Sequence, residues 1–365
     1  MTLRATKLLF LAILCYLVLY FPPMSYAGRY SVSAIPGTTP GTIACGTSIS
    51  NSGVVMGSYG GGNITGYFLW SNAGGTTNIG YSGVEFNNAP SSQNQLVGTE
   101  WVGINQSYAV VRNEDGTLSR LNYLHPSDAM ASVLAVSDTG TAIGYSASNS
   151  SGQPVLWNLS TGTAVQIGTS GLNEGVDNAV ISNSGYAAWT NLQVVVHQEG
   201  YPGPHTEMLF STFLRDPSGT VTELNPTPSA NCPHVVDIAD SGRVLISDAF
   251  NNSWLWNPGS ALTPVALNSV FAMNGAGQIL GSIDGRSVVL DTNGTLSNLP
   301  LPDGARSARV ADINDNGVVV GWAEFTDPND VRAVLWAPVP EPSALAALSC
   351  GIFWMLTGVI RRRSS

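Results

Sequence analysis

Short hydrophobic stretches alternate with polar, glycine-containing turns along the middle of the chain. Seven segments repeat this order, the second of them in weaker form: "SISNSGVVMG" (48–57), "PSSQNQLVG" (90–98), "AVSDTGTAIG" (135–144), "VISNSGYAAW" (180–189), "DIADSGRVLI" (237–246), "AMNGAGQILG" (272–281) and "DINDNGVVVG" (312–321). Asn, Asp and Ser favour the first positions of a tight turn, and Gly accepts the left-handed position that ends it. Each segment therefore predicts two strands joined by a hairpin turn.

A third and a fourth strand follow each hairpin. The third strands are apolar and end at Trp70, Val111, Trp157, Leu214, Trp256, Leu290 and Trp336. A further turn such as "DPSGT" then precedes a short strand such as "VTEL". A repeat of about 44 residues with four strands is typical of propeller blades. We therefore predict an all-β, seven-bladed β-propeller; an irregular β-solenoid or a pair of β-sandwiches is the alternative.

The ends of the repeat region predict how the ring closes. The last unit stops at Trp336 without a fourth strand, whereas an unmatched strand lies near the start, at about Tyr30 to Ile35. We expect this N-terminal strand to complete the last blade. Such closure removes the open sheet edge that otherwise invites aggregation.

The turn "DINDNG" also invites a metal interpretation, because Asp312, Asn314 and Asn316 alternate before Gly317 as they do at the start of a calcium-binding loop. That motif needs a bidentate Glu at its twelfth position, where this chain has Ala323. The other repeats fill the same place with turns that lack these oxygens. The pattern favours a turn.

The N-terminal segment predicts export. Arg4 and Lys7 precede an apolar run from Leu8 to Phe21, and small residues lie before Ala27. This order is typical of a secretory signal peptide over residues 1–27. A retained membrane anchor is the alternative, although the apolar run is shorter than a span of roughly 20 residues.

The C-terminal segment, residues 339–365, predicts a membrane-spanning tail. The 17 residues from Ala344 to Ile360 carry no charge, and three arginines follow at 361–363. At about 1.5 Å per residue this helix just crosses a hydrocarbon core, with the arginines on the cytoplasmic side. The repeat region, residues 28–338, would then lie outside the cell.

"VPEPS", a short apolar helix and an arginine cluster, in this order, resemble the PEP-CTERM sorting tail of Gram-negative bacteria. The resemblance implies that an exosortase recognises Pro340, Glu341 and Pro342, removes the helix, and releases the protein to the cell surface or an exopolysaccharide matrix. An ordinary tail anchor is the alternative. The repeats themselves resemble the extracellular HAF family, although "YFLW" and "AVLW" replace its His-Ala-Phe triplet.

Charge excludes some partners of the exported region. Nine arginines, no lysine and 23 acidic residues leave it with a formal net charge of −14. A nucleic acid would be repelled by this charge, so we expect no nucleic-acid partner. Cys45 and Cys232 are its two cysteines, and an oxidising compartment permits a disulfide, but their spacing does not show that they meet.

Tryptophans and arginines supply candidate ligand-binding residues. Trp70, Trp157, Trp256 and Trp336 share one repeat position, which predicts packing between blades. Trp101, Trp189 and Trp322 follow the second strand in only some repeats, so they are candidates for stacking on sugars, with core packing as the alternative. Arg306 and Arg309, expected in a loop before the last blade, are candidates for holding a carboxylate.

The fourth repeat contains an insertion, residues 194–210, that predicts a protruding hairpin. If the strands pair about Pro202, His197 faces Glu207 and Glu199 faces His205, all on one face. Two imidazoles and two carboxylates can bind a divalent metal. Simple cross-strand His–Glu pairs are the alternative.

No motif of an assembled active site is present, such as a nucleophile elbow or a phosphate-binding loop. We therefore expect a non-enzymatic structural or adhesive surface protein without a cofactor, associated with exopolysaccharide. The alternative is a propeller-based glycan hydrolase or lyase, because a propeller can bring carboxylates of separate blades together and Asp237 and Asp312 precede equivalent turns.

Overall fold

The computed structural model describes most of the repeat region. The described residues are 30–37, 43–61, 64–80, 83–86, 90–93, 95–148, 151–171, 174–197, 205–224 and 232–339. Residues Tyr30–Pro338 form one compact unit. The predicted signal peptide and the sorting tail from Pro340 onward lie outside the described residues. Within the described part, no helix has the length and apolar character needed to cross a membrane.

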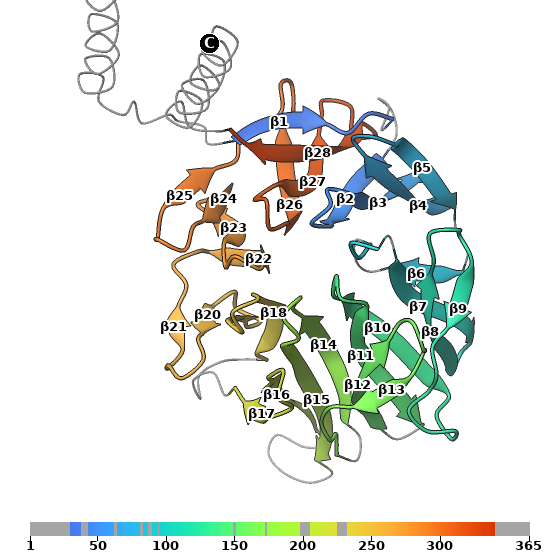
Figure 1. Cartoon of the computed structure of the whole chain (residues 1–365). Coiled ribbons are helices and arrows are strands. Elements are labelled where there is room, and N and C mark those ends of the chain that lie inside the picture. The colour runs from blue at the N-terminus through green and yellow to red at the C-terminus, as the bar shows by residue number, and fades with distance from the viewer. Residues whose placement is uncertain are drawn as a thin grey trace, which may run out of the picture. The chain divides into compact units, whose positions relative to one another are not determined.

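Five of the sheets contain four antiparallel strands each, in chain order. They are β6 (Val84–Phe86), β7 (Leu96–Gly103), β8 (Gln106–Arg112) and β9 (Leu118–Arg120); β10 (Met130–Val136), β11 (Thr141–Ser148), β12 (Ser151–Asn158) and β13 (Ala164–Gln166); β14 (Glu174–Ile181), β15 (Ala187–His197), β16 (His205–Arg215) and β17 (Val221–Glu223); β18 (His234–Ile238), β19 (Val244–Ser247), β20 (Ser253–Trp256) and β21 (Thr263–Pro264); and β22 (Ser269–Met273), β23 (Ile279–Ile283), β24 (Arg286–Leu290) and β25 (Leu296–Asn298). The prediction of an all-β chain built from four-stranded, propeller-like sheets is confirmed, and the sheets follow one another around a ring (Figure 1).

A sixth sheet of eight strands joins the two ends of the repeat region. Its strands are β26 (Ser307–Ile313), β27 (Val319–Glu324), β28 (Val331–Pro338), β1 (Tyr30–Ala34), β2 (Ile43–Ile49), β3 (Val55–Gly61), β4 (Ile64–Ser71) and β5 (Gly75–Gly80). β1 runs antiparallel to β28 with Tyr30 opposite Pro338 and Ala34 opposite Val334. The predicted pairing of the N-terminal strand with the last apolar strand is thereby confirmed. β2 meets β28 through one parallel pair, Ile43 and Val331.

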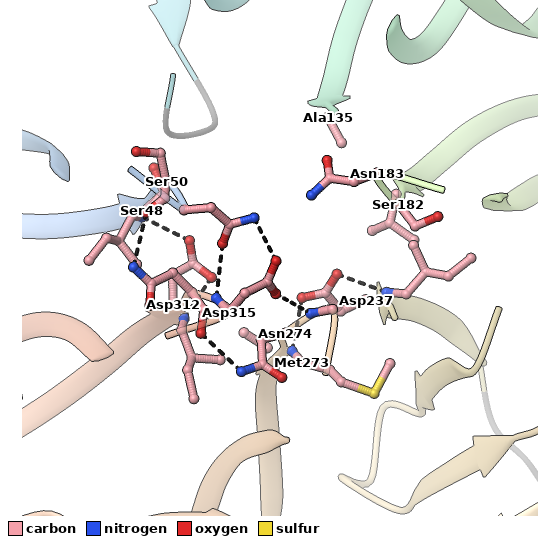
Figure 2. A pocket seen from close by; sticks show the side chains of 18 of the residues that line it. Ser48, Ser50, Ala135, Ser182, Asn183, Asp237, Met273, Asn274, Asp312 and Asp315 are labelled. Atoms are coloured by element: carbon pink, nitrogen blue, oxygen red, sulfur yellow. Dashed lines mark hydrogen bonds between the residues drawn. The ribbon is translucent and has the colours of Figure 1, made fainter. Parts of the chain in front are cut away.

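Six strands, β2, β10, β14, β18, β22 and β26, each end at the turn that the repeat predicts, and these ends surround the pocket drawn in Figure 2. Gly53 and Gly317 close two of these turns with φ of 81° and 73°, a conformation that glycine adopts without steric cost. "DINDNG" is such a turn, because Gly317 N donates to Asn314 O. A β-bulge recurs shortly before the turn, for example between Val235 and Asp237. A bulge re-aims the side chains that follow it.

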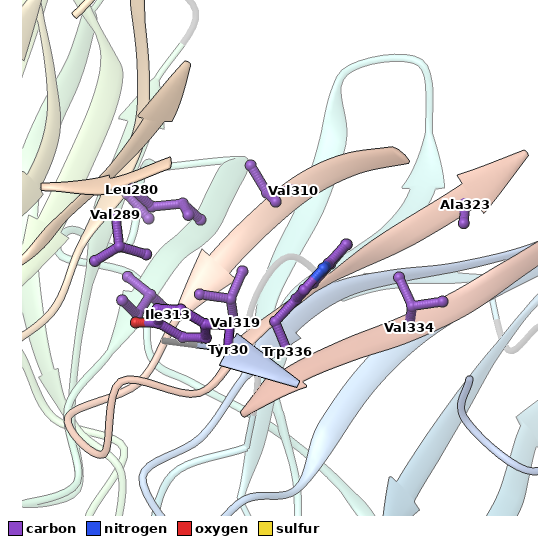
Figure 3. Packing of buried hydrophobic residues seen from close by; sticks show 10 residues of the cluster. Tyr30, Leu280, Val289, Val310, Ile313, Val319, Ala323, Val334 and Trp336 are labelled. Carbon is purple, nitrogen blue, oxygen red and sulfur yellow. The ribbon is translucent and has the colours of Figure 1, made fainter. Parts of the chain in front are cut away.

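Hydrophobic side chains fill the space between neighbouring sheets. Figure 3 shows one such cluster, in which Tyr30 of β1 and Trp336 of β28 pack with Leu280 and Val289 of the preceding sheet. Trp336 Nε1 donates to Pro300 O at 2.7 Å, and the equivalent Trp157 Nε1 donates to Asn122 O at 2.8 Å. Both rings are buried, as predicted for this repeat position, and Trp70 and Trp256 pack as half-buried neighbours of other clusters.

Candidate functional site

A polar pocket of about 300 Å³ lies among the ends of the first strands, and we call it the axial pocket. Its lining comes from the ends of β2, β10, β14, β18, β22 and β26, from the turns that follow them, and from Pro90 and Ser91 (Figure 2). These segments are far apart in the sequence. The repeat brings them together because every sheet presents the same turn to the same place.

Residues at the second position of these turns form a circuit of hydrogen bonds around the pocket. In order, Ser92 N donates to Asp138, Asp138 N to Asn183, Asn183 N to Asp240, Asp240 N to Gly275 O, Gly275 N to Asp315, and Asp315 N to Asn51. Asn51 Nδ2 then donates to both Asp315 and Asp138, at 2.7 and 3.1 Å. The circuit fixes the turns, and with them the mouth of the pocket, relative to one another.

Two further carboxyl groups line the axial pocket from the strands themselves. Asp237 Oδ2 accepts from Met273 N of the next sheet at 2.8 Å, and its Oδ1 accepts from Ile238 N at 2.8 Å. Asp312 makes the same pair of bonds, from Ile49 N at 2.9 Å and Ile313 N at 2.8 Å. Both aspartates follow the bulge of their strand. Each carboxyl is therefore held in a fixed orientation between the inner strands of two neighbouring repeats.

The surroundings raise the pKa of both carboxyls toward neutrality. Enclosure by protein raises the pKa of Asp237 to about 7, with the charge of Asp312 adding to the rise and the backbone bonds opposing it. Enclosure likewise raises the pKa of Asp312 to about 6, against the bonds from Ile49 and Ile313. Both side chains keep partial access to the pocket. Acids with a pKa near the working pH are suited to proton transfer.

Ser48 occupies the place in the first repeat that Asp312 occupies in the last. Its side chain is only 5% exposed and it lines the axial pocket. Among the described residues, its Oγ has no hydrogen-bond partner. An enclosed hydroxyl without a partner is costly unless a ligand or water satisfies it. Ser48 therefore marks a polar position that a bound molecule can occupy.

The charge of the axial pocket has one sign. Among the described residues, its lining contains five aspartates, at positions 138, 237, 240, 312 and 315, and no Lys, Arg or His. Such a site repels anions and favours neutral or cationic ligands. Sequence reasoning picked out Asp237 and Asp312 but missed Ser48 and the circuit residues. An alignment of the repeats would have found them, because it places Ser48 in one column with Asp237 and Asp312 and the circuit residues together in a second column.

The three candidate tryptophans have different surroundings, and they lie within second strands rather than after them. Trp101 in β7 is 43% exposed, and Trp322 in β27 is half-buried. Trp189 in β15 is only 1% exposed and stacks on Phe213 at 5.4 Å between ring centroids. The hypothesis that Trp189 stacks on sugars is wrong, because the ring has no free face. None of the three lines the axial pocket.

The two candidate arginines do not form the predicted loop site. Arg306 precedes β26, but Arg309 lies within that strand, opposite Trp322. Both arginines are exposed. Neither lines the axial pocket.

The insertion in the fourth repeat forms the predicted hairpin, with β15 and β16 each 11 residues long. The predicted register is wrong: His197 lies opposite His205, and Glu207 lies opposite Val195. The observed pairing is shifted from the predicted one, and a hairpin's register depends on its turn geometry as well as on the apolar pattern of its arms. Glu199 lies outside the described residues, as do the side chains of both histidines. The metal hypothesis stays a prediction. Cys45 and Cys232 do not form a disulfide with each other.

The comparisons with known proteins agree with the fold. No protein-family model matches the chain, and no curated protein is similar enough to count as a relative. Among solved structures, an inactive variant of virginiamycin B lyase from Staphylococcus aureus has a TM-score of 0.53 at 12% identity, covering 85% of this chain and 100% of that one. Oligogalacturonate lyase from Vibrio parahaemolyticus has 0.54 at 11%, covering 86% and 97%. The β-propeller domain of the Trilobed protease from Pyrococcus furiosus has 0.51 at 9%, covering 82% and 96%. These likenesses define the class of protein as a β-propeller.

The same comparisons correct one expectation. The sequence led us to expect a protein without enzymatic activity, whereas the solved structures that share its fold include two named lyases. This likeness contradicts the expectation, because the fold is one that enzymes use. The absence of known active-site motifs was a poor guide, because a propeller assembles a site from single residues of separate sheets. At such low identity the likeness shows the fold alone.

Proposed function

We propose that this chain is a glycan-cleaving enzyme with its catalytic centre in the axial pocket. The observation that carries the proposal is the pair Asp237 and Asp312: two carboxyls from separate sheets, lining one pocket, with pKa values raised to about 7 and about 6. Their environments separate the two pKa values, which is how two chemically identical groups take the roles of acid and base.

The two aspartates suit the hydrolysis of a glycosidic bond. This reaction uses one protonated carboxyl to donate a proton to the leaving oxygen, and one carboxylate as base or nucleophile. The higher pKa of Asp237 favours the proton on that residue and the negative charge on Asp312 at mildly acidic pH. Asp237 is then the general acid and Asp312 the base or nucleophile. Backbone N–H groups hold both carboxyls, so substrate binding need not orient them.

The charge of the pocket favours hydrolysis of a neutral or cationic glycan over elimination from a polyuronate. In the part of the chain that the structure describes, five aspartates and no basic side chain line the pocket. A uronate would enter against repulsion, and no Arg or Lys of the lining neutralises its carboxylate. The oligogalacturonate lyase likeness therefore supports an enzyme but not that substrate. Ser48, whose Oγ lacks a partner, offers a hydrogen bond to a sugar hydroxyl.

The rest of the proposal concerns architecture and place. Counting the two halves of the eight-stranded sheet as separate blades gives seven, the number that the repeats predict. The predicted signal peptide and the PEP-CTERM resemblance, which implies an exosortase partner, support export from a Gram-negative cell to its surface or its exopolysaccharide. An extracellular glycan is the substrate class that this location supplies.

The test is to incubate the full chain with neutral, amino-sugar and uronate polysaccharides and to measure new reducing ends at several pH values. We expect cleavage of a neutral or amino-sugar polymer with a bell-shaped pH profile centred between 6 and 7. Cleavage that persists in both Asp237→Asn and Asp312→Asn variants would place the chemistry elsewhere. No release of reducing ends from any polymer class, with the protein folded, would refute the proposal.

A further inference from the structure

A second cavity of about 620 Å³ opens between the sheets that begin with β6, β10 and β14, and we call it the side cleft. Its lining includes Glu85, Tyr145, Glu174 and Asp177 together with hydroxyl-bearing residues such as Thr99 and Ser132. A volume of this size lies within the range of about 300 to 1,000 Å³ that is usual for ligand sites.

The side cleft is distinct from the axial pocket. β10 and β14 contribute their earlier residues to the side cleft and their last residues to the axial pocket. On β10, Leu134 lines the side cleft and the next residue, Ala135, lines the axial pocket. The bulge between Val133 and Ala135 falls at this change. A ligand in the side cleft is therefore not the substrate held at the Asp237 and Asp312 pair.

An aromatic ring stands beside the side cleft. Trp101 is 43% exposed, an unusual state for a tryptophan of a central strand. Its Nε1 donates to Glu85 Oε2 at 3.1 Å, and Glu85 lines the cleft. The hydrogen bond fixes the orientation of the indole while leaving ring surface open. An exposed and oriented aromatic ring is suited to stacking against the apolar face of a sugar.

The charge of the side cleft is negative. Glu85, Glu174 and Asp177 supply three carboxylates, and no Lys, Arg or His is among the described residues of the lining. Asp177 is the extra residue of the bulge in β14 and is exposed. Glu174 accepts from Gly171 N at 2.5 Å, which holds its side chain near the opening. No basic side chain of the lining balances these charges, so the cleft favours a cation.

Polar donors and acceptors complete the lining. Thr99 Oγ1 and Ser132 Oγ are 2.6 Å apart at the base of the cleft. Tyr145 lies close enough to Glu85 for that carboxylate to add to the rise that burial causes in the tyrosine's pKa. The hydroxyl of Tyr145 therefore stays protonated and can donate a hydrogen bond. A hydroxyl-rich ligand finds partners on this surface.

We propose that the side cleft binds an oligosaccharide of amino sugars, with Trp101 stacked on a pyranose ring and the carboxylates of Glu85, Glu174 and Asp177 paired with protonated amino groups. Stacking accounts for the exposed indole, and charge pairing accounts for three carboxylates without a cation. A polyuronate is excluded by repulsion, and a neutral glycan forgoes the charge pairing. The proposal does not depend on the chemistry of the axial pocket.

Isothermal titration of the full chain with three probes tests the proposal: glucosamine oligomers, cello-oligosaccharides and oligogalacturonates, at mildly acidic pH. We expect the glucosamine oligomer to bind at least tenfold more tightly than the neutral oligomer, and the oligogalacturonate to show no binding. Added salt, or a pH at which the amines lose their protons, should weaken binding of the glucosamine oligomer.

Variants locate the binding. Trp101→Ala and Glu85→Gln should each lower the affinity for the glucosamine oligomer at least tenfold. Ile104→Ala is the matched control, because Ile104 is an exposed residue of the adjoining turn that does not line the cleft. Equal binding of neutral and amino sugars, or affinity unchanged in both variants, overturns the proposal. A loss of binding in Asp237→Asn but not in Glu85→Gln would move the ligand to the axial pocket and also overturn it.

Discussion

Two kinds of junction join the inner strands of neighbouring repeats in this ring. Where β18 meets β22, and again where β26 meets β2, an aspartate of one inner strand accepts an N–H from the next strand. Where β22 meets β26, Ala272 occupies the position of those aspartates, and hydrophobic side chains such as Tyr30 and Trp336 fill the junction (Figure 3). The backbone bulge is the same in both kinds.

The difference shows that the ring does not require carboxyls at its junctions. Apolar residues close the same geometry at the β22–β26 junction, with Asn274 Nδ2 donating to Asn314 O at 2.9 Å as the polar link. Enclosing a carboxyl costs free energy that backbone hydrogen bonds only partly offset, as the raised pKa values of Asp237 and Asp312 indicate. Carboxyls whose pKa values are perturbed and whose enclosure costs stability are candidates for catalytic roles.

The largest expected effect is a loss of activity when the aspartate at the β18–β22 junction or at the β26–β2 junction is replaced. Asp237→Asn and Asp312→Asn each remove a titrating group and keep the size of the side chain, so kcat should fall by about 10² to 10⁴. Asp303→Asn, at an exposed turn, is the control and should leave the rate of reducing-end release unchanged. A rate within threefold of the parent protein in both variants would show that the aspartates at these junctions are not needed for catalysis.

The second largest effect is expected on stability at the β22–β26 junction, which hydrophobic side chains fill. Tyr30→Ala removes a ring that is 7% exposed and packs against the cluster in Figure 3, so the free energy of unfolding should fall by about 3 to 4 kcal/mol. Ser31→Ala changes the exposed neighbour on the same strand and should cost less than about 0.5 kcal/mol. Denaturant titration of both variants gives the two values. Equal costs would mean that β1 contributes hydrogen bonds but no packing.

The pH dependence of stability should also differ between the junctions with an aspartate and the junction without one. Because the folded pKa of Asp312 is raised from 3.8 to about 6, the native state binds the proton more tightly than the unfolded chain does. Its stabilising contribution is complete below pH 3.8 and is lost as the pH rises through 6, a loss of about 2 to 3 kcal/mol. Asp312→Asn should remove this loss. Unfolding free energies at several pH values check the sign, and a parent protein that gains stability over this range would contradict it.

The smallest effect concerns Ser48. Its Oγ has no partner among the described residues, so Ser48→Ala should change stability by less than about 1 kcal/mol, or raise it slightly, while increasing KM several-fold. Ser50→Ala is the matched control, because Ser50 Oγ accepts from Val54 N at 3.0 Å and its removal should cost about 1 kcal/mol. If Ser48→Ala were as destabilising as Ser50→Ala, its hydroxyl would have a structural partner and no vacancy for a ligand.

Much of the fold followed from local features of the sequence. The apolar alternation and the glycine turns are set within a few residues, so they predicted the strands, their order and the turn at "DINDNG". The missing fourth strand of the last repeat predicted that Tyr30 and its neighbours pair with β28, because an unfilled edge needs a partner.

The candidate site was harder to predict because it depends on neighbours in space. Trp101 and Trp189 occupy second strands of different sheets, yet Phe213 covers Trp189 whereas Trp101 stays exposed. The register of the β15–β16 hairpin differed by one residue at its turn, since arms of similar polarity fit more than one pairing. Asp237 drew notice by its place before a turn, but its enclosure comes from other sheets.

The pairing of β1 with β28 places the first and last residues of the compact unit, Tyr30 and Pro338, directly opposite each other. A short peptide linking these two positions would turn the unit into a covalent circle, and a new opening could then be made in any exposed turn, for example at Gly259. Such circular permutants should form the same sheets, with the two chain ends at another position in the ring.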